Sequence, residues 1–255
     1  MRIPKIIHFC WLSDDPYPQE IQRCLDSWKK ILPDYEIWKW DRKRFDINSV
    51  PWTKEAFESK KYAFAADYIR LYALYNYGGI YLDSDVLMYK SFNPLLNLPY
   101  FIGTDMIGYF EPAIIGAEKG ISFIGDVLDY YNGKHFVNNN GVLATDVPLP
   151  GIFYNVLKNA YSFKKVSIGE TYEDDGKIMR VFSHKEFNGR NSVKIQQYKE
   201  SFCSHNFVGS WYKPRKGIRG YLRKVLPTFI VRSILFFSER INSKKFIYRI
   251  NVDKK

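Results

Sequence analysis

Hydrophobic positions in the first third of the chain alternate between strand-like runs and helix-like spacing. Short apolar runs predict strands at residues 3–11 and 80–82, and an alternating pattern predicts one at residues 35–40. An apolar residue every three or four positions predicts a helix at residues 18–31, and residues 62–77 form a second, almost entirely apolar helix. Strands that alternate with helices in this order are typical of a doubly wound α/β sheet with right-handed crossovers. The later elements are predicted in the same way: strands at residues 100–104 and 113–117, and helices at residues 121–131 and 153–161. Residues 45–61 carry mixed signals.

The predicted helix at residues 62–77 contains two ionisable side chains in an otherwise apolar setting. Apart from tyrosines, its only polar residues are Asp67, Arg70 and Asn76. A helix that is apolar on nearly all sides is a buried helix, and residues three positions apart share a helix face. Buried charges are tolerated when they are paired or bound to a ligand. A structural salt bridge and a ligand-binding pair therefore both fit Asp67 and Arg70.

Two aspartates follow the next predicted strand. Gly78 and Gly79 end the helix, because glycine adopts the left-handed conformation that closes a helix C-terminus. After residues 80–82, Asp83 and Asp85 would lie on one side of an extended strand, roughly 7 Å apart. Open α/β sheets bind ligands beyond the carboxyl ends of their strands, and Mg²⁺ and Mn²⁺ favour oxygen ligands. The sequence therefore predicts a divalent-metal site at this pair.

These residues form one motif, A-x-D-x-x-R-x-x-x-L-x-x-x-G-G-x-Y-x-D-x-D, which runs from Ala65 to Asp85. It resembles the signature of the family 32 glycosyltransferases, the enzymes with a sugar-binding region that contains D-x-D. The resemblance implies a GT-A type α/β fold, a mostly parallel central sheet flanked by helices, and metal-dependent, retaining transfer of a hexose from a nucleotide-diphosphate sugar. In this interpretation Asp67 and Arg70 hold the donor sugar hydroxyls. Asp85 holds Mn²⁺ or Mg²⁺ directly, and Asp83 binds the metal through water or contacts the ribose.

A second segment, residues 205–211, has the form H-x-x-x-G-S-W. It is similar to the segment that closes the active site in the same family. The similarity implies that His205 reaches the metal and that Ser210 and Trp211 touch the diphosphate. A neutral imidazole is a good ligand for Mn²⁺, and an indole N–H can donate to an oxyanion. In the first predicted strand, Trp11 matches the aromatic residue that stacks on the nucleotide base.

The substrates are less closely defined by the sequence. Tyr81 would lie on the same strand side as Asp83 and line the ribose pocket. The resembling family uses UDP-hexoses and GDP-mannose, and we favour UDP-galactose or UDP-glucose. The expected acceptor is a glycan or a lipid-linked oligosaccharide in cell-surface polysaccharide synthesis. Residues 145–148 stand where many family members have Gly-Pro, which leaves open whether Asp146 takes part in acceptor binding.

The net charge of +11 is concentrated at the C-terminal end. Residues 213–255 contain 13 basic and two acidic residues, whereas the charges of residues 1–212 balance. The apolar stripe of residues 218–230 has helical spacing, and the run at residues 225–237 is too short for the ~20 residues of a bilayer span. We therefore predict a GT-A catalytic domain at 1–212 and a basic amphipathic helical segment at 213–255 that binds an anionic membrane surface. Packing of the stripe onto the domain is the alternative.

Three scattered cysteines indicate reduced thiols, and no secretory signal or N-terminal anchor is visible. These features favour a bacterial cytoplasmic enzyme, peripheral at the inner membrane face. Two other classes compete with a glycosyltransferase. A metal-dependent phosphohydrolase would usually need further carboxylates or histidines, and the chain has four histidines. A nucleic-acid-binding protein would explain the basic segment but not the buried charges beside D-x-D, so we expect no nucleic-acid partner.

Overall fold

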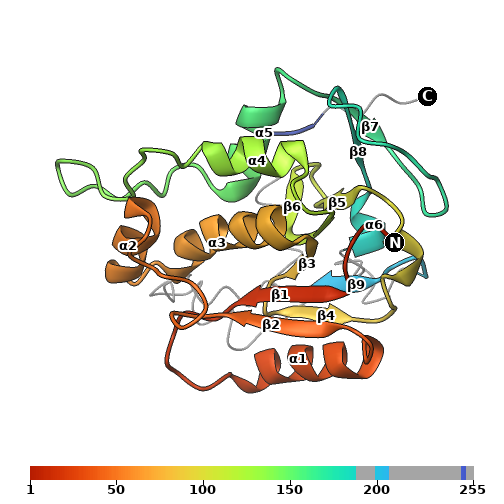
Figure 1. Ribbon diagram of the computed structural model, residues 1–255, viewed down its shortest axis with the longest axis horizontal. Coiled ribbons are helices and arrows are strands. Elements are labelled where there is room, and N and C mark those ends of the chain that lie inside the picture. Colours follow the sequence, from red (N-terminus) through yellow and green to blue (C-terminus); the bar gives the residue numbers. More distant parts are fainter. Residues whose placement is uncertain (188–198, 207–247, 251–255) are drawn as a thin grey trace, which may run out of the picture.

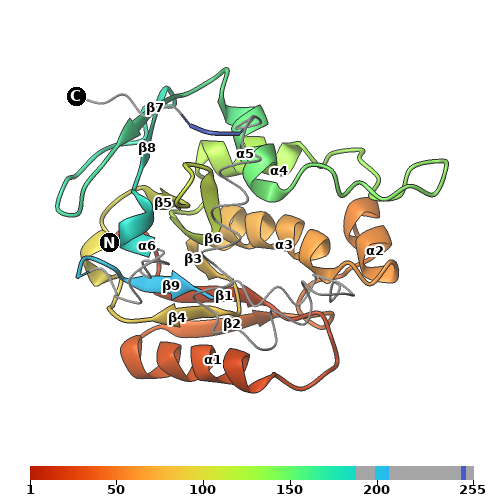
Figure 2. The ribbon, with the colours of Figure 1, turned by 180° about the vertical axis from the view of Figure 1, so that it is seen from behind.

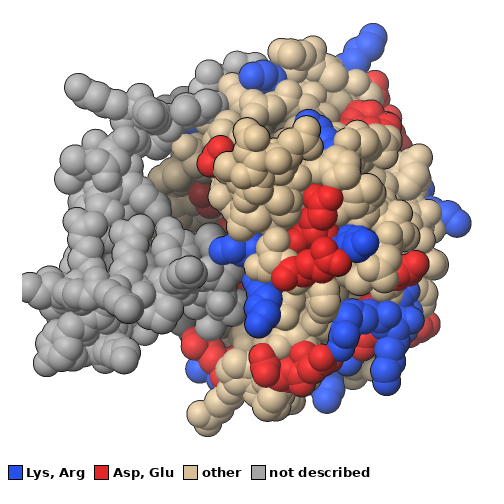
Figure 3. Space-filling model, turned by 90° about the vertical axis from the view of Figure 1, so that its left-hand side faces the viewer, with Lys and Arg blue, Asp and Glu red and all other residues tan. Residues whose placement is uncertain are grey.

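The computed structural model describes three stretches of the chain, residues 1–187, 199–206 and 248–250 (Figure 1). Two predicted site residues, Ser210 and Trp211, and most of the predicted basic segment lie outside these stretches. The domain boundary after residue 212 and the amphipathic helix therefore stay predictions. Among the described residues, no helix combines the length and the hydropathy needed to cross a lipid bilayer. Basic and acidic side chains are interspersed over the described surface seen in Figure 3, in keeping with the balanced charge of residues 1–212.

A five-stranded sheet with the order β2-β1-β3-β6-β5 forms the centre of the molecule. Its strands are β1 (Ile6–Cys10), β2 (Glu36–Trp40), β3 (Gly79–Leu82), β5 (Tyr100–Thr104) and β6 (Phe110–Ala117). β1 pairs in parallel with both β2 and β3, and β6 is antiparallel to both β3 and β5. Four of the five strands therefore point the same way, which confirms the predicted α/β fold with a mostly parallel central sheet. Because β1 and β3 are parallel neighbours, the residues that follow them meet at one edge.

Helices cover both faces of this sheet (Figures 1 and 2). They are α1 (Gln19–Ile31), α2 (Pro51–Glu58), α3 (Tyr62–Tyr77), α4 (Ser122–Asp129) and α5 (Leu149–Leu157). α1 lies on one face, where the indole N–H of Trp28 donates to the Val86 carbonyl at 2.7 Å. α3 lies on the opposite face against β1, β3 and β6, with α2 and α4 packed on it in turn. Placing successive crossover helices on opposite faces is the doubly wound arrangement that the sequence predicts.

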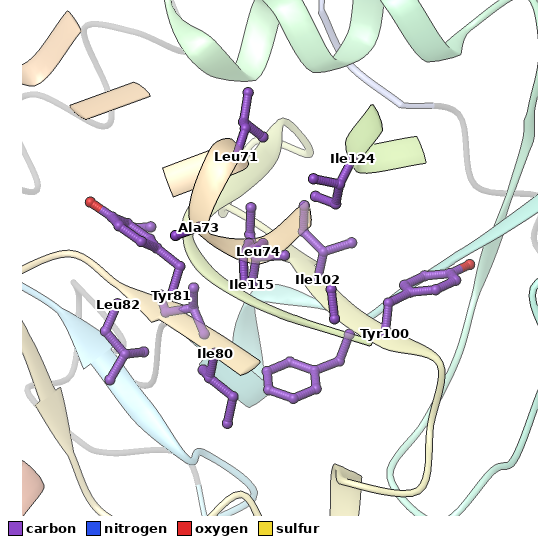
Figure 4. Packing of buried hydrophobic residues seen from close by; sticks show 14 of the residues in the cluster. Leu71, Ala73, Leu74, Ile80, Tyr81, Leu82, Tyr100, Ile102, Ile115 and Ile124 are labelled. Carbon is purple, nitrogen blue, oxygen red and sulfur yellow. The ribbon is translucent and has the colours of Figure 1, made fainter. Parts of the chain in front are cut away.

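The centre of the hydrophobic core lies where α3 meets the sheet (Figure 4). The fully buried residues at this contact are Leu71, Ala73, Leu74, Ile80, Ile102 and Ile115. Complete burial of a large aliphatic side chain contributes about 1.5–3 kcal/mol, so this contact fixes α3 firmly on the strands. α3 is not buried on all sides, however: Tyr75 and Tyr77 are 38% and 41% exposed. Its C-terminal end is therefore partly open to solvent, a difference from the buried helix that the sequence predicts.

The connection from α3 to β3 requires two glycines and a buried histidine. Gly78 and Gly79 have φ of +65° and +104°. The helix therefore ends in positive-φ glycines as predicted, although Gly78, with ψ of −170°, lies outside the left-handed helical region. A Cβ on Gly79 would lie 2.7 Å from the Ile6 carbonyl oxygen, so only glycine lets β3 begin this close to β1. His8 on β1 accepts the Trp40 indole N–H at Nδ1 (3.0 Å), and its Nε2 donates to the Gly78 carbonyl at 2.7 Å. Burial lowers the pKa of His8 from 6.5 to about 4.

Several short elements complete the structure. They are β4 (Val86–Met88), β7 (Ser162–Lys165), β8 (Ile178–Val181), β9 (Cys203–His205), α6 (His184–Phe187) and a 3₁₀ turn at Asn93–Leu95. β4 pairs with β9 in an antiparallel ladder, and β7 pairs with β8 in parallel. Each has only three or four residues, too few for a periodic pattern, and the sequence predicts none of them. β6 and α5 also begin three and four residues earlier than predicted, at Phe110 and Leu149.

Candidate active site

Asp83 and Asp85 lie in the turn between β3 and β4 rather than in an extended strand. The Val86 N–H donates to the Asp83 carbonyl at 3.0 Å and closes this turn. The Asp83 N–H donates to the Ala113 carbonyl of β6 at 2.9 Å, which fixes the point where β3 ends. The predicted extended geometry is therefore wrong, because aspartate and serine favour turns over strands. The turn nevertheless directs both carboxylates into one group.

His205 joins these carboxylates from a distant part of the chain. In the β4–β9 ladder it pairs with Val86, and the next residue, Asn206, donates its N–H to the Asp85 carbonyl at 3.1 Å. Nε2 of His205 lies 3.2 Å from Asp85 Oδ1 and 3.9 Å from Asp83 Oδ2. One potential ligand atom from each of the three residues lies within 4.8 Å of the others. Two carboxylate oxygens and an imidazole nitrogen suit Mn²⁺ or Mg²⁺, so the residues present fit a divalent cation.

The imidazole of His205 lies in a strongly negative environment. Its second ring nitrogen, Nδ1, is 3.3 Å from Oε1 of Glu111 on β6. Burial by itself lowers the pKa of His205, but the charges of Asp85 and Glu111 outweigh burial and raise that pKa well above its ordinary value. This concentration of negative charge attracts a cation, which is the electrostatic property that a metal site needs.

Arg70 connects the D-x-D turn to α3. Its Nη2 lies 2.9 Å from Asp67 Oδ1 and 3.3 Å from Asp83 Oδ1, and its side chain is 6% exposed. Nη1 donates to the Pro112 carbonyl at 2.8 Å. Burial raises the pKa of Asp67 to about 6, although the positive charge of Arg70 acts in the opposite direction. Burial also raises the pKa of Asp83, with Arg70 and His205 opposing it. One guanidinium thus only partly offsets the cost of burying these carboxylates.

Tyr81 is placed beneath this guanidinium. Its ring centroid is 4.5 Å from Arg70 Cζ, a cation–π geometry. Its hydroxyl donates to Asp83 Oδ1 at 3.0 Å, and the residue is only 1% exposed. Tyr81 thus contacts both Asp83 and Arg70, and its place in the lining of a ribose pocket stays a prediction.

Two buried polar atoms near the Asp67–Arg70 pair have no hydrogen-bond partner among the described residues: Arg70 Nε and the Tyr131 hydroxyl. Tyr131 packs edge-on against Trp52 and Tyr68, the residue after Asp67 on α3. Burial, and then the charge of Asp67, raise the pKa of Tyr131 well above its ordinary value. An unpaired buried donor costs about 1–3 kcal/mol, so these two atoms oppose folding in the structure as it stands.

The predicted base-stacking residue lies at the same edge. Trp11 directly follows β1, which is paired in parallel with β3 through Ile7 and His8, opposite Ile80 and Tyr81. Trp11 is partly exposed, its indole N–H donates to the Asp15 carbonyl at 3.0 Å, and it meets the Tyr17 ring edge-on at 4.9 Å. The predicted diphosphate contacts, Ser210 and Trp211, lie outside the described residues.

The sequence prediction missed Glu111, the Pro112 carbonyl and Tyr131. A single acid next to the apolar run of residues 112–117 was a usable signal for Glu111, but the predicted strand begins only at residue 113. Tyr131 gave no comparable signal, because it is one of 20 tyrosines in the chain. The feature that distinguishes Tyr131 is its unpaired hydroxyl, which can be recognised only in the folded structure.

Together, the fold and this site define an α/β protein with a carboxylate–imidazole group that could hold a cation, placed where β3 ends. Residues 18–102 match the family described as "Glycosyltransferase sugar-binding region containing DXD motif". The chain belongs to this glycosyltransferase family, as the motif at residues 65–85 predicts.

Its curated relatives are similar over part of their length. Mannosyl phosphorylinositol ceramide synthase SUR1 of Saccharomyces cerevisiae is 36% identical over 217 residues, which cover 71% of this chain and 55% of that protein. Inositol phosphoceramide mannosyltransferase 3 of Schizosaccharomyces pombe is 32% identical over 130 residues, covering 49% of this chain and 36% of the relative. The chain thus spans about a third to a half of these proteins. A solved structure, PaToxG Glycosyltransferase, is 22% identical with a TM-score of 0.45, covering 62% of this chain and 69% of that one.

These comparisons contradict the expectation of a bacterial cytoplasmic enzyme at the inner membrane face. The relatives named above are fungal proteins. The expectation depended on unpaired cysteines and on the absence of a visible anchor, and neither observation determines the kind of organism or the compartment. The expected role in cell-surface polysaccharide synthesis loses its basis for the same reason.

Proposed function

We propose that the protein is a divalent-metal-dependent glycosyltransferase that moves a hexose from a nucleotide-diphosphate sugar to a hydroxyl of a glycan or lipid acceptor, with retention of configuration. The observation that carries this proposal is the convergence of Asp83, Asp85 and His205 within 4.8 Å, beside the buried Asp67–Arg70 pair. We call Asp83, Asp85 and His205 the cation group, because together they could hold a metal ion. A phosphohydrolase would need the cation group but not the Asp67–Arg70 pair, which adds hydrogen-bonding groups suited to a sugar.

In this proposal Asp85 and His205 hold Mn²⁺ or Mg²⁺, and Asp83 completes the site directly or through water. The bound cation would supply Lewis-acid stabilisation of the negative charge on the departing diphosphate. Arg70 and Tyr81 keep Asp83 oriented, since both contact its Oδ1. Ser210 and Trp211 are proposed to contact the diphosphate, and Trp11 to stack on the base.

The donor sugar would bind on the α3 side of the cation group. Asp67 accepts hydrogen bonds from sugar hydroxyls, while Arg70 Nε and the Tyr131 hydroxyl donate to them. Both donors are buried and have no hydrogen-bond partner among the described residues, so binding a polyhydroxylated ligand would satisfy groups that the fold leaves unpaired. This explains why ionisable groups are retained in a core contact whose burial they oppose.

The names of the relatives favour a mannosyl donor. Both fungal proteins described above act, by name, on mannose and an inositol-containing ceramide. We therefore place GDP-mannose beside UDP-galactose and UDP-glucose as candidate donors, and a lipid with a polyol head group beside a glycan as candidate acceptor.

The test is a donor panel with purified full-length protein and Mn²⁺. Release of nucleoside diphosphate is measured with GDP-mannose, UDP-glucose and UDP-galactose, with and without EDTA. We expect one donor to be turned over, EDTA to abolish the reaction, and Asp85→Asn to reduce it at least 1000-fold, an order of magnitude typical for removal of essential transition-state charge stabilisation. Asp129→Asn at the end of α4 is the matched control and should retain wild-type turnover.

Two results would contradict the proposal. Turnover that persists in EDTA and in Asp85→Asn would remove the cation site from the reaction. Release of inorganic phosphate from simple phosphate esters, with no reaction of any nucleotide sugar, would favour the phosphohydrolase. With an acceptor in hand, NMR of the first-formed anomer tests retention.

A further inference from the structure

The two ring nitrogens of His205 face carboxylates on opposite sides. Nε2 is directed at Asp85 and Asp83, at 3.2 and 3.9 Å, and Nδ1 at Glu111, at 3.3 Å. We propose that Glu111 is a positioning residue of the cation site: it accepts the Nδ1–H of His205 and thereby presents the Nε2 lone pair to the metal. This inference deepens the proposed function and rests on it.

The start of β6 is built to deliver Glu111 to this position. Three consecutive residues each make a contact at the site: Glu111 with His205, the Pro112 carbonyl with Arg70, and the Ala113 carbonyl with the Asp83 N–H. β6 is also bonded on its other side to β5, where Glu111 is level with Gly103 just after a register shift. A carboxylate carried on a paired strand is held more precisely than one on a loop.

The burial of Glu111 also requires an explanation. Its side chain is 7% exposed, and a buried carboxylate is unfavourable unless it is paired. The neighbouring Asp105 experiences its charge, since burial and then Glu111 raise the pKa of Asp105 to about 7. Glu111 and the partly buried Asp105 are thus two acids close together, an arrangement that is unfavourable by itself. Among the described residues, the partner of Glu111 that also belongs to the metal-ligating group is His205.

Glu111 is not itself one of the grouped ligands. The cation group consists of Asp83, Asp85 and His205, and Glu111 contacts the imidazole at the nitrogen that faces away from it. Metal-binding histidines commonly donate their second N–H to a carboxylate, which fixes the tautomer and ring orientation and makes the ligand more basic. Loss of such a partner typically weakens metal affinity about 10–100-fold.

The test measures Mn²⁺ binding to the full chain without any substrate, from the EPR signal of free Mn²⁺. Glu111→Leu should raise the Mn²⁺ Kd about 10–100-fold. Glu111→Gln keeps an oxygen acceptor and should raise it by a smaller factor, about threefold to tenfold on the same scale. Glu118→Gln is the matched control, because Glu118 follows the opposite end of the same strand and pairs with Arg2. It should bind Mn²⁺ like the wild type.

A second readout identifies the mechanism. In protein labelled with ¹⁵N-histidine and loaded with diamagnetic Zn²⁺, we expect His205 of the wild type and of Glu111→Gln to carry its proton on Nδ1. The chain has four histidines, so His205→Asn assigns the resonance. Glu111→Leu should lose the fixed Nδ1–H state.

The outcomes separate the inference from the proposed function. If the wild type does not bind Mn²⁺, the cation site is wrong and the inference is overturned with it. If the wild type binds and Glu111→Leu binds equally tightly, only the inference is overturned. If Glu111→Leu does not fold, Glu111→Gln is tested in its place. An Mn²⁺ Kd of Glu111→Gln equal to that of the wild type would then overturn the inference.

Discussion

Arg70 on α3 and Asp83 at the end of β3 are joined across the helix–strand connection, with Nη2 of Arg70 3.3 Å from Asp83 Oδ1. The same nitrogen lies 2.9 Å from Asp67 Oδ1. One guanidinium therefore links the proposed sugar-binding carboxylate to the D-x-D turn. The Asp67–Arg70 pair is therefore more than a local salt bridge within α3. A sugar-binding pair and a purely structural pair predict different effects of mutation on turnover and on stability.

Asp67→Asn should impair the reaction far more than the fold. Burial raises the pKa of Asp67 to about 6, so at neutral pH its ionised form is disfavoured in the folded state relative to the unfolded state. Arg70 also keeps its contact with Asp83 in the variant. We therefore expect the free energy of unfolding to stay within about 1 kcal/mol of wild type, whereas breaking a structural buried pair costs about 3–5 kcal/mol.

The measurements for this variant are urea unfolding at pH 7.5, donor turnover, and binding of free nucleoside diphosphate. Turnover should fall by about 100-fold or more, with little change in diphosphate binding. Arg70→Ala is the informative companion: it leaves Asp67 and Asp83 without their shared cation and should lose both stability and turnover. Normal turnover in folded Asp67→Asn, together with a large loss of stability, would establish the pair as structural.

Gly79→Ala should destabilise the protein through the close approach of β3 to β1. The added Cβ would lie 2.7 Å from the Ile6 carbonyl oxygen, at a φ of +104° that side chains rarely adopt. We expect a loss of about 2–3 kcal/mol in urea unfolding. Gly120→Ala is the matched control, because Gly120 also has positive φ, +75°, but nothing lies within 4 Å of its Cβ. An equal loss in both variants would show that the contact with Ile6 contributes nothing.

The local part of this protein could be predicted from its sequence. α3 and β5 match their predicted bounds residue for residue, because a long apolar helix closed by two glycines and a strand flanked by turn formers are specified by nearby residues. Asp67, Arg70, Asp83 and Asp85 lie within 19 residues of each other, so their spacing along one helix and one strand end was enough to group them.

The rest of the site depends on long-range pairing that no short window contains. Glu111 reaches His205 only because β6 is antiparallel to β3 while β9 pairs with β4, and β4 and β9 have three residues each. The turn at Asp83 follows from a hydrogen bond to Ala113, 30 residues away. Tyr131 shows the same limit, since its unpaired hydroxyl is a property of the completed packing.

His8 should make the stability pH-dependent with a defined sign. Burial lowers its pKa from 6.5 to about 4, so the unfolded state takes up a proton first as the pH falls. The contribution of neutral His8 is complete above pH 6.5 and is lost as the pH falls from 6.5 toward 4. Between pH 7.5 and 5 this amounts to about 2 kcal/mol.

Comparison with His8→Gln isolates this contribution from that of the carboxylates. Glutamine does not titrate, so the difference in unfolding free energy between wild type and variant should shrink by about 2 kcal/mol as the pH falls from 7.5 to 5. A difference that stays constant over this range would show that His8 is not held neutral by the fold.

Tyr131→Phe should lower activity without lowering stability, whereas most core mutations lower stability. The Tyr131 hydroxyl is buried and has no hydrogen-bond partner among the described residues, so its removal eliminates a desolvation cost. We expect the free energy of unfolding to be unchanged or to rise by about 1 kcal/mol. If the hydroxyl donates to the donor sugar, turnover should fall about 10-fold, which is the effect of about 1.4 kcal/mol.

Tyr172→Phe is the control for this experiment. The Tyr172 hydroxyl is also buried, but it donates to the Tyr100 carbonyl, so its loss should cost about 1 kcal/mol of stability and leave turnover unchanged. The two tyrosines thus predict opposite results from the same chemical change. Wild-type turnover in Tyr131→Phe would show that the sugar does not use this hydroxyl, and the donor pocket would then have to be built from Asp67 and Arg70 alone on this side of the cation group.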